Sequence, residues 1–418
     1  MAKSRSVVIV GTLDTKGQEL GYLRDCLAAR GAATLVVDAG VLDTPDFVPD
    51  VDRYTVAAAA GMRLDDLVQT ADRGQAVAAM AAGAARVVAD LFAQGKVAGV
   101  IGIGGSGNAT IACAAMRALP IGVPKLMLTT LAAGDTRPFV GSADIAMMYS
   151  VVDIAGLNRF SRRILANAAA AVAGMAAAFQ PVDVTDEVRP LLGATMFGVT
   201  TPCVTAARQT LEELGYEVLV FHATGVGGRS LEALVRDGFI TGVLDVTTTE
   251  LADEIAGGAL SAGPERLDAA GLAGIPQVVS LGALDMANFG PLESVPERFR
   301  TRQLYQHNPA VTLMRTTPEE NAKVGELIAT KLNRACGPVA LFVPRGGVSA
   351  ISVPGGVFHD PDADAALFAA LRGALAAHVE LIEMEVHIND PAFAQAMATK
   401  LHQLYVRWKE GEGDGITS

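Results

Sequence analysis

The chain has 418 residues, half of them apolar but only 5% aromatic, so aliphatic side chains must fill the cores of two or three domains. Its formal net charge of −12 argues against a general nucleic-acid-binding protein, which requires clustered Lys and Arg. No apolar run reaches the roughly 20 residues that cross a bilayer, so we expect no membrane-spanning segment and no membrane partner.

The first predicted element is a strand at residues 6–10, which starts too early to leave room for a signal peptide before it. The four cysteines are dispersed along the chain without a CxxC pair. This pattern is typical of a reducing compartment rather than of a disulfide scaffold or a zinc ribbon. Together these features predict a cytoplasmic protein.

Short apolar strands alternate with helices through the first half of the chain. A helix over Leu20, Leu23 and Leu27 follows the first strand, and the stretch 42–71, rich in Asp and Pro at its start, is interpreted as an insertion. Uniformly apolar runs separated by helices indicate a parallel sheet covered on both faces. The predicted strands of this half are residues 6–10, 34–37, 97–103 and 122–130.

The second half repeats this plan in the same order. Its predicted strands are residues 194–197, 218–221, 240–246 and 274–280, followed by an appendix of strands at 339–343 and 381–388 and a helix at 391–408. Four matched segments predict an α/β fold of two similar doubly wound, Rossmann-like parallel-sheet domains that arose by internal duplication. A boundary near residues 180–190 separates a predicted nucleotide-binding domain, residues 1–182, from a second domain, residues 190–418.

Ligands of open parallel sheets bind beyond the carboxyl ends of the strands, so the turns after the strands are candidate sites, with a ligand cleft expected between the two domains. The first turn, residues 11–17 (GTLDTKG), leaves a strand and opens a helix, where free N–H groups and the helix dipole favour an anion. Lys16 adds a positive charge, and Asp14 can orient it or approach a metal. The turn is not a P-loop. The alternative is a simple capped turn, with Asp14 or Thr15 as the N-cap.

The second turn, residues 102–110, follows the third predicted strand and is rich in glycine. Glycines allow a phosphate to approach the backbone closely, although they also serve tight packing of a helix on a sheet. Asp38, at the end of the second strand, is a candidate for binding a ribose hydroxyl, with a solvated strand-end residue as the alternative. The turn that contains Thr130 is expected to complete the pocket.

The second half offers its own polar turns. Residues 222–230 contain Gly225, Gly227, Gly228 and Arg229, which form a second candidate cradle for an anion. Candidate residues for acid–base catalysis follow later strands. They are Glu250, Asp285 and His307, with His222 and His387 also of the right type. Because no pair shows HExxH-type spacing and lone histidines are more often structural, no metal ligand is assigned.

Four motifs together resemble one known family. They are residues 11–17 (GTLDTKG), 102–108 (GIGGSGN), 153–158 (DIAGLN) and 222–228 (HATGVGG). They are similar to those of the ATP-binding domain family of the tomato mosaic virus resistance protein, and the resemblance extends from about Val7 to Phe393. The plant member continues into a barrel-like domain that resembles a phosphoenolpyruvate-hydrolase-type enzyme, whereas this chain stops near Ser418.

The resemblance implies two Rossmann-like domains, ATP held between them, a homodimer, and a separately encoded barrel-type enzyme as a partner. The residues that it assigns to ATP coincide with the first and second turns. They are Gly11, Thr12, Asp14, Thr15, Lys16, Gly104, Gly105, Ser106, Gly107 and Asn108.

Three functions remain open from the sequence. The first is an enzyme that uses ATP, with Mg²⁺ on the phosphates, on a small carboxylated or phosphorylated metabolite. The second is a non-catalytic module that senses ATP and regulates a partner. The third is a metabolite-binding enzyme that uses no nucleotide. Of these we favour the first.

Overall fold

The computed structural model describes residues 5–179 and 189–414. The predicted boundary at residues 180–190 therefore lies almost entirely outside the described residues. The chain divides into two compact units, unit 1 (Met1–Asp183) and unit 2 (Val184–Ser418). Each unit has its own sheet and its own buried cores, and each is described by itself.

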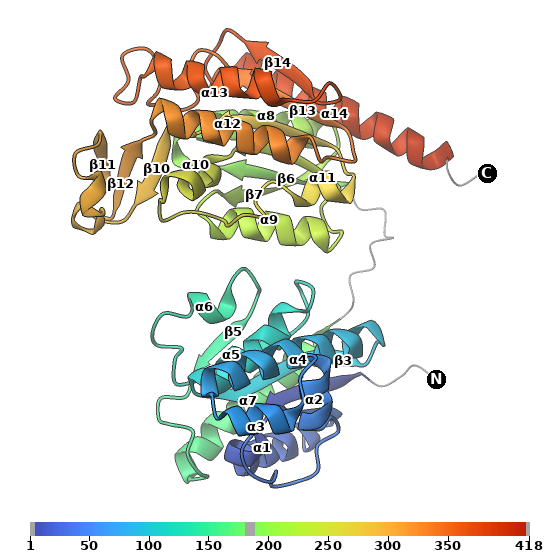
Figure 1. Ribbon diagram of the computed structural model, residues 1–418. Helices are drawn as coiled ribbons and strands as arrows, with labels where there is room; N and C mark the ends of the chain where they lie inside the picture. Colours follow the sequence, from blue (N-terminus) through green and yellow to red (C-terminus); the bar gives the residue numbers. More distant parts are fainter. Residues whose placement is uncertain (1–4, 180–188, 415–418) are drawn as a thin grey trace. The chain divides into compact units, whose positions relative to one another are not determined.

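Unit 1 is built on a five-stranded parallel sheet with the order β2-β1-β3-β4-β5. Figure 1 labels β3 and β5 of this sheet together with helices of the unit. Four strands fall where the apolar runs predict them, whereas the half-exposed fifth strand, at the edge, was not predicted. The strands are β1 (Ser6–Gly11), β2 (Thr34–Asp38), β3 (Val97–Gly104), β4 (Lys125–Thr129) and β5 (Ala146–Tyr149).

Helices cover both faces of this sheet, as uniformly apolar strands require. Val7 and Ile9 of β1 pack in one core with α1 (Leu13–Ala28) and α7 (Arg159–Ala178). Val8 and Val10 point the other way, because successive side chains alternate across a strand. They pack in a second core with α4 (Arg73–Ala93) and α5 (Ser106–Arg117).

The stretch interpreted as an insertion folds into two short helices, α2 (Arg53–Ala59) and α3 (Leu64–Thr70). Val56 and Leu67 are buried in the same core as α4, so this stretch belongs to the unit rather than looping away from it. A further short helix, α6 (Arg137–Val140), precedes β5.

Helix α4 is long and apolar enough to cross a membrane by length and composition alone, although the sequence predicted no such segment. Its buried residues Met80, Ala84 and Val88 belong to the core beside the sheet, and the helix packs on α5. One face of the helix therefore belongs to the core, although only 39% of its apolar stretch is buried, and a single such helix is weak evidence for a membrane span.

Unit 2 has a six-stranded parallel sheet with the order β14-β13-β9-β8-β6-β7. Its part β7-β6-β8-β9 has the same order as β2-β1-β3-β4, while a common origin of the halves stays a prediction. The two strands of the expected appendix, β13 and β14, extend this sheet instead of forming a separate layer. The strands are β6 (Leu191–Met196), β7 (Glu217–His222), β8 (Gly242–Thr247), β9 (Gln277–Gly282), β13 (Val339–Pro344) and β14 (Glu380–Met384).

The helices of unit 2 also lie in separate cores. Two of them share a core with β6, namely α8 (Thr201–Glu213) and α14 (Pro391–Asp414). The others are α9 (Val226–Arg236), α10 (Thr249–Ala256), α11 (Ala269–Ala273), α12 (Pro318–Leu332) and α13 (Pro361–Ala374). A small antiparallel sheet, which the sequence did not predict, comprises β10 (Met286–Phe289), β12 (Val311–Arg315) and β11 (Leu304–Asn308).

Candidate functional site

A cavity of about 620 Å³ lies in unit 1 at the carboxyl ends of β1 and β3. These neighbouring strands flank the point where the strand order of the sheet reverses, which is where doubly wound folds bind their ligands. The cavity brings together the two turns that the sequence singled out. From these turns it is lined by Thr12, Asp14, Thr15, Lys16, Gly105, Ser106, Gly107 and Asn108.

The N-terminus of α5 is open at this cavity. Its N-cap is Gly105, which has no side chain to cap the helix. Within residues 5–179 and 189–414, the backbone N–H groups of Ser106, Gly107 and Asn108 have no acceptor. Gly104 has a φ of +142°, and a Cβ there would lie 2.8 Å from that of Asn108, so only glycine fits. Free N–H groups and the positive end of the helix dipole make this terminus attractive to an anion.

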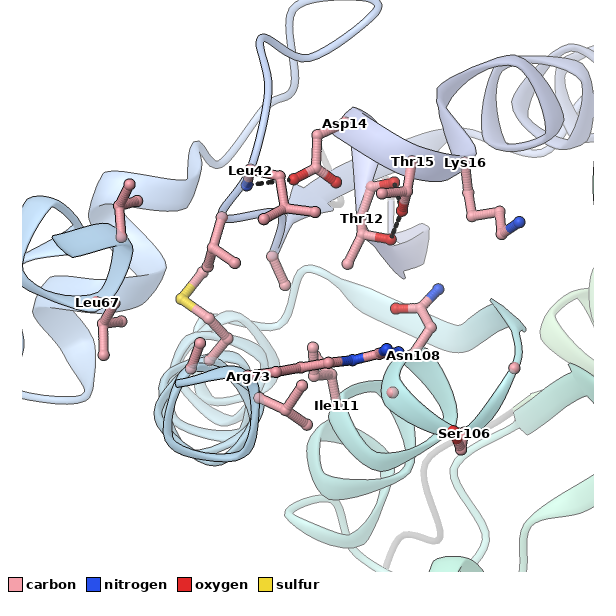
Figure 2. A pocket seen from close by; sticks show the side chains of 18 of the residues that line it. Thr12, Asp14, Thr15, Lys16, Leu42, Leu67, Arg73, Ser106, Asn108 and Ile111 are labelled. Atoms are coloured by element: carbon pink, nitrogen blue, oxygen red, sulfur yellow. Dashed lines mark hydrogen bonds between the residues drawn. The ribbon is translucent and has the colours of Figure 1, made fainter. Parts of the chain in front are cut away.

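The start of α1 forms the opposite wall, as Figure 2 shows. The hydroxyl oxygens of Thr12 and Thr15 are 2.7 Å apart. Asp14 accepts a hydrogen bond from the Leu42 N–H through Oδ2 at 2.7 Å, which ties the segment after β2 to this turn. Its Oδ1 is buried and has no partner among the described residues.

Lys16 is held by the third of the four motifs, residues 153–158. Its ammonium group donates to the Ile154 carbonyl, and Glu19 accepts from the Gly156 N–H at 2.7 Å. Residues 153–158 therefore dock on α1, and Asp153 itself lines the cavity. Asn158 does not face the ligand space; it caps α7 by accepting from two backbone N–H groups.

Arg73 is a cavity residue that the sequence analysis missed. It is the first residue of α4 and is exposed, and a Cβ on Gly107 would lie 3.8 Å from its Nη2. In the part of the chain that the structure describes, its guanidinium joins no ion pair and donates no hydrogen bond. The charge of Arg73 and the positive end of the α5 dipole lie close together. Both would attract an anion bound at this end of the cavity.

Apart from Asp72, which caps α4 by accepting from the Gln75 N–H, the remainder of the cavity wall is apolar. The side chains come from the segment after β2, from α3, from the start of α4 and from α5 (Figure 2). They are Ala39, Val41, Leu42, Leu67, Val68, Ala71, Ala76, Val77, Met80 and Ile111. The cavity therefore has a polar part at two helix starts and an apolar part beside it.

The other residues predicted for this site take structural positions. Asp38 is fully buried and accepts through Oδ1 from the N–H groups of Leu13 (3.0 Å) and Gly40 (2.9 Å), which fixes the turns. It does not line the cavity, and its ribose role stays a prediction. Burial raises the pKa of Asp38 above its ordinary value, although these two N–H groups lower it. Gly11 packs against Leu20, and Thr130 is not among the cavity residues.

The second predicted cradle is filled by the protein itself. Glu250 accepts from the N–H groups of Gly225 (2.6 Å) and Gly228 (3.0 Å), and a Cβ on Gly228 would collide with this carboxylate. Gly227 packs against the His222 carbonyl, and Arg229 donates to the Ser261 carbonyl at 3.2 Å. In this structure the N–H groups expected to hold a phosphate are bonded to a side-chain carboxylate.

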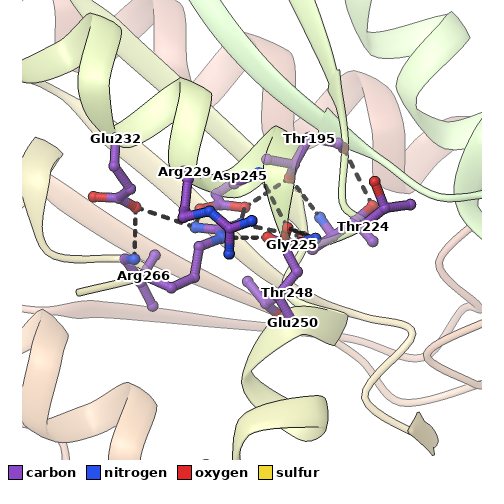
Figure 3. A network of polar contacts seen from close by, with 12 residues as sticks. Thr195, Thr224, Gly225, Arg229, Glu232, Asp245, Thr248, Glu250 and Arg266 are labelled. Atoms are coloured by element: carbon purple, nitrogen blue, oxygen red, sulfur yellow. Dashed lines mark hydrogen bonds and ion pairs between the residues drawn. The ribbon is translucent and has the colours of Figure 1, made fainter. Parts of the chain in front are cut away.

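Glu250 belongs to a buried ionic network centred on Arg266 (Figure 3). The fully buried Arg266 donates to Glu250 (2.6 Å) and, through two nitrogens, to Asp245 (2.6 Å each), with Glu232 at 3.4 Å. Burial alone would lower the pKa of Arg266, but Asp245 and Glu250 raise it well above its ordinary value. Three carboxylates around one guanidinium make this cluster a structural unit of the fold.

Asp285 and His307 lie apart from this network. Asp285 is fully buried and accepts from the Ser349 hydroxyl at 2.7 Å; burial raises its pKa to about 7, although Arg315 lowers it. His307 is exposed on β11. Among the described residues, no hydrogen bond or ion pair links any two of Glu250, Asp285 and His307, and no group of three or more His, Cys, Asp or Glu has the arrangement of a metal site. Their catalytic roles stay predictions.

Fold and cavity define a class: α/β proteins of two parallel-sheet units, with a cavity at the strand ends of the first. Family models make the assignment specific. The N-terminal domain of the Uncharacterised protein family (UPF0261) matches residues 5–181, and its C-terminal domain matches residues 189–405. The chain belongs to this family.

Curated relatives agree with this assignment. The chain is 52% identical to a UPF0261 protein of Clostridium tetani over 399 residues, which cover 95% of this chain and 98% of that one. It is 41% identical to the ToMV resistance protein Tm-1(GCR237) of Solanum lycopersicum over 421 residues, covering 95% of this chain but 55% of the tomato protein. The resemblance to the tomato family is thus confirmed, and this chain spans about half of that relative.

Solved structures add little. A UDP-N-acetylglucosamine 2-epimerase from Rickettsia bellii aligns over 66% of this chain and 78% of its own, at 12% identity and a TM-score of 0.21. That score is too low to carry an argument.

Proposed function

We propose that unit 1 binds ATP or a closely related nucleotide in the 620 Å³ cavity. The observation that carries the proposal is the position of Arg73 beside the uncapped N-terminus of α5. Phosphate oxygens would accept from the N–H groups of Ser106, Gly107 and Asn108 and from the Arg73 guanidinium. The aliphatic part of the cavity would take the base, since nucleotide and cofactor sites are mostly apolar with a few placed polar groups.

One carboxylate of this cavity, that of Asp14, could hold a magnesium ion bound to the phosphates. Asp14 presents a buried Oδ1 without a protein partner among the described residues. Mg²⁺ is held in nucleotide sites by one or two carboxylates together with phosphate oxygens and water. Asp14 is the residue that would hold the ion, which would neutralise phosphate charge.

The function that we favour is an enzyme that uses ATP on a small carboxylated or phosphorylated metabolite. A second candidate, a module that senses ATP without catalysis, is favoured by one observation: Glu250 is committed to the network around Arg266. A ligand held between the two domains, a homodimer, a barrel-type enzyme partner and a cytoplasmic location stay predictions.

Thermal unfolding of the full nucleotide-free chain, with and without millimolar ATP and Mg²⁺, tests the binding proposal. A ligand at 100 times its dissociation constant adds about 2.7 kcal/mol to the stability, so the midpoint should rise clearly. Arg73→Ala should lose most of this rise. Arg63→Ala, which removes an exposed arginine of the same unit whose surface ion pair is with Asp65, should keep it. No rise with ATP in the wild type would overturn the proposal.

A further inference from the structure

Unit 2 has a separate cavity of about 200 Å³ at the carboxyl end of β13. The turn Arg345, Gly346 and Gly347 follows this strand and forms one wall, and the start of α13 forms another. The carboxyl end of a parallel strand is the usual place for a ligand. The cavity is smaller than the roughly 300–1,000 Å³ that drug-sized ligands occupy, so it selects a small molecule.

His359 lines this cavity with a defined tautomer. Its Nδ1 lies 3.1 Å from the Ser352 carbonyl oxygen, which can only accept, so Nδ1 carries the proton. The neutral ring therefore has Nε2 as an acceptor. In the described residues, no protein group donates to this nitrogen. A histidine oriented by a backbone carbonyl is the usual arrangement for moving a proton at its other nitrogen.

Asp364 is the second acceptor of the cavity. Its side chain is only 13% exposed and is held by Arg315, itself 3% exposed, through a 2.8 Å ion pair to Oδ1. Burial raises the pKa of Asp364, while Arg315 lowers it. Arg315 also donates to the carbonyls of Phe358 and Asp285, so the backbone just before His359 and the carboxylate of Asp364 are fixed by one buried cation.

Arg345 provides the positive charge at the mouth of the cavity. It pairs with Glu385 at 2.7 Å and Glu383 at 3.7 Å, and its side chain is 43% exposed. Exposed ion pairs contribute only about 0–1 kcal/mol, so a ligand carboxylate can replace Glu385, itself 77% exposed, at little cost.

We propose that this cavity is a second ligand site, which takes a small carboxylate that carries a neighbouring hydroxyl or ammonium group. The ligand carboxylate binds Arg345, and its proton donor faces Nε2 of His359 and the carboxylate of Asp364. His359 is then placed to take up that proton. None of these residues lies in unit 1, so the inference does not depend on nucleotide binding.

The test is a titration of the full chain, labelled with ¹⁵N-histidine, with lactate and malate as hydroxy acids and with alanine and aspartate as ammonium acids. Binding in either class should shift the ring-nitrogen signals of His359, which the His359→Gln variant identifies. Arg345→Gln should weaken binding at least about tenfold, because a charged hydrogen bond is lost. His378→Gln, on an exposed histidine of the same unit, should leave the affinity unchanged.

Binding of only the hydroxy acids or only the ammonium acids supports the site and identifies the proton donor that the ligand carries. Two results would overturn the inference: no signal of His359 moves with millimolar amounts of any of the four acids, or Arg345→Gln binds them as the wild type does. The melting temperature of Arg345→Gln, which should match that of the wild type because Arg345 is half exposed, excludes loss of the fold as the cause.

Discussion

Arg73 and Lys16 both line the unit 1 cavity, but only the Lys16 side chain makes a hydrogen bond among the described residues. The Lys16 ammonium donates to the Ile154 carbonyl and thereby helps to hold residues 153–158 on α1. Arg73 has no such structural contact among the described residues. The lysine that the sequence singled out thus serves the fold as well as the site, whereas the arginine that it missed is free for a ligand.

This difference predicts how the two variants behave without nucleotide. Lys16→Ala should lower the free energy of unfolding by about 1 kcal/mol, because a hydrogen bond from a charged donor is lost. Arg73→Ala should change it by less than about 0.5 kcal/mol, as is usual for an exposed side chain. Urea denaturation of the nucleotide-free chain measures both, and equal destabilisation by the two would contradict this assignment of roles.

Arg266 compensates the carboxylates of Asp245, Glu250 and Glu232 inside unit 2. Arg266→Met would leave buried carboxylates without their cation, so the free energy of unfolding should fall by about 3–5 kcal/mol. Arg236→Ala is the matched control, because it breaks an exposed pair with Glu265 and should cost about 0–1 kcal/mol. Urea denaturation distinguishes them; a mild effect of Arg266→Met would mean that the carboxylates are protonated or solvated instead.

Asp285 predicts a pH dependence of stability. Its pKa is raised by burial from 3.8 to about 7 in the folded chain, so the folded state holds this proton more tightly than the unfolded state. Its contribution to stability is therefore fully present below pH 3.8 and is lost as the pH rises towards 7. Relative to Asp285→Asn, the wild type should lose free energy of unfolding between pH 4 and pH 7. Parallel curves for the two proteins would contradict this prediction, and Asp237→Asn on the surface is the control.

At the scale of elements, the central strands were predictable because each is an uninterrupted apolar run. Strand β5 was not, since its residues are half exposed and its pairing depends on β4 beside it. The small antiparallel sheet was missed for a similar reason, as β11 is mostly exposed. Helices α2 and α3 were missed because their polar surroundings resemble a loop, and only their burial against α4 shows that they belong to the core.

The last helix, α14, packs one face in the core of unit 2 and leaves the other face exposed. Leu401 of α14 is fully buried in the core with β6 and α8, whereas Val406 on the same helix is 39% exposed. Leu401→Ala should lower the free energy of unfolding by about 2–5 kcal/mol through the lost burial and the cavity left behind. Val406→Ala should cost less than about 1 kcal/mol. Urea denaturation would contradict the account if the two variants were equally stable.

At the scale of the whole molecule, the sequence predicted two parallel-sheet units, and the structure and the family models bear out that coarse statement. It also paired the first and second turns correctly, because the carboxyl ends of β1 and β3 must meet at one edge of the sheet. It could not foresee Arg73, which reaches the cavity from another helix, or Glu250, whose side chain folds back onto Gly225 and Gly228. The positions of both side chains depend on tertiary packing, which the local sequence pattern does not predict.

The two Gly-rich turns that the sequence offered as anion cradles therefore differ in the structure, and they do not stand at matching positions of the two sheets. The N–H groups at the start of α5 in unit 1 are open, whereas those of Gly225 and Gly228 in unit 2 are bonded to Glu250. This difference predicts one nucleotide for each chain rather than two.

Calorimetric titration of the full nucleotide-free chain with ATP and Mg²⁺ tests this central claim most directly. The account predicts one molar equivalent of ATP per chain, with affinity strongly reduced by Arg73→Ala and retained by Arg63→Ala. The absence of binding at millimolar ATP, or a stoichiometry of two per chain, would contradict it.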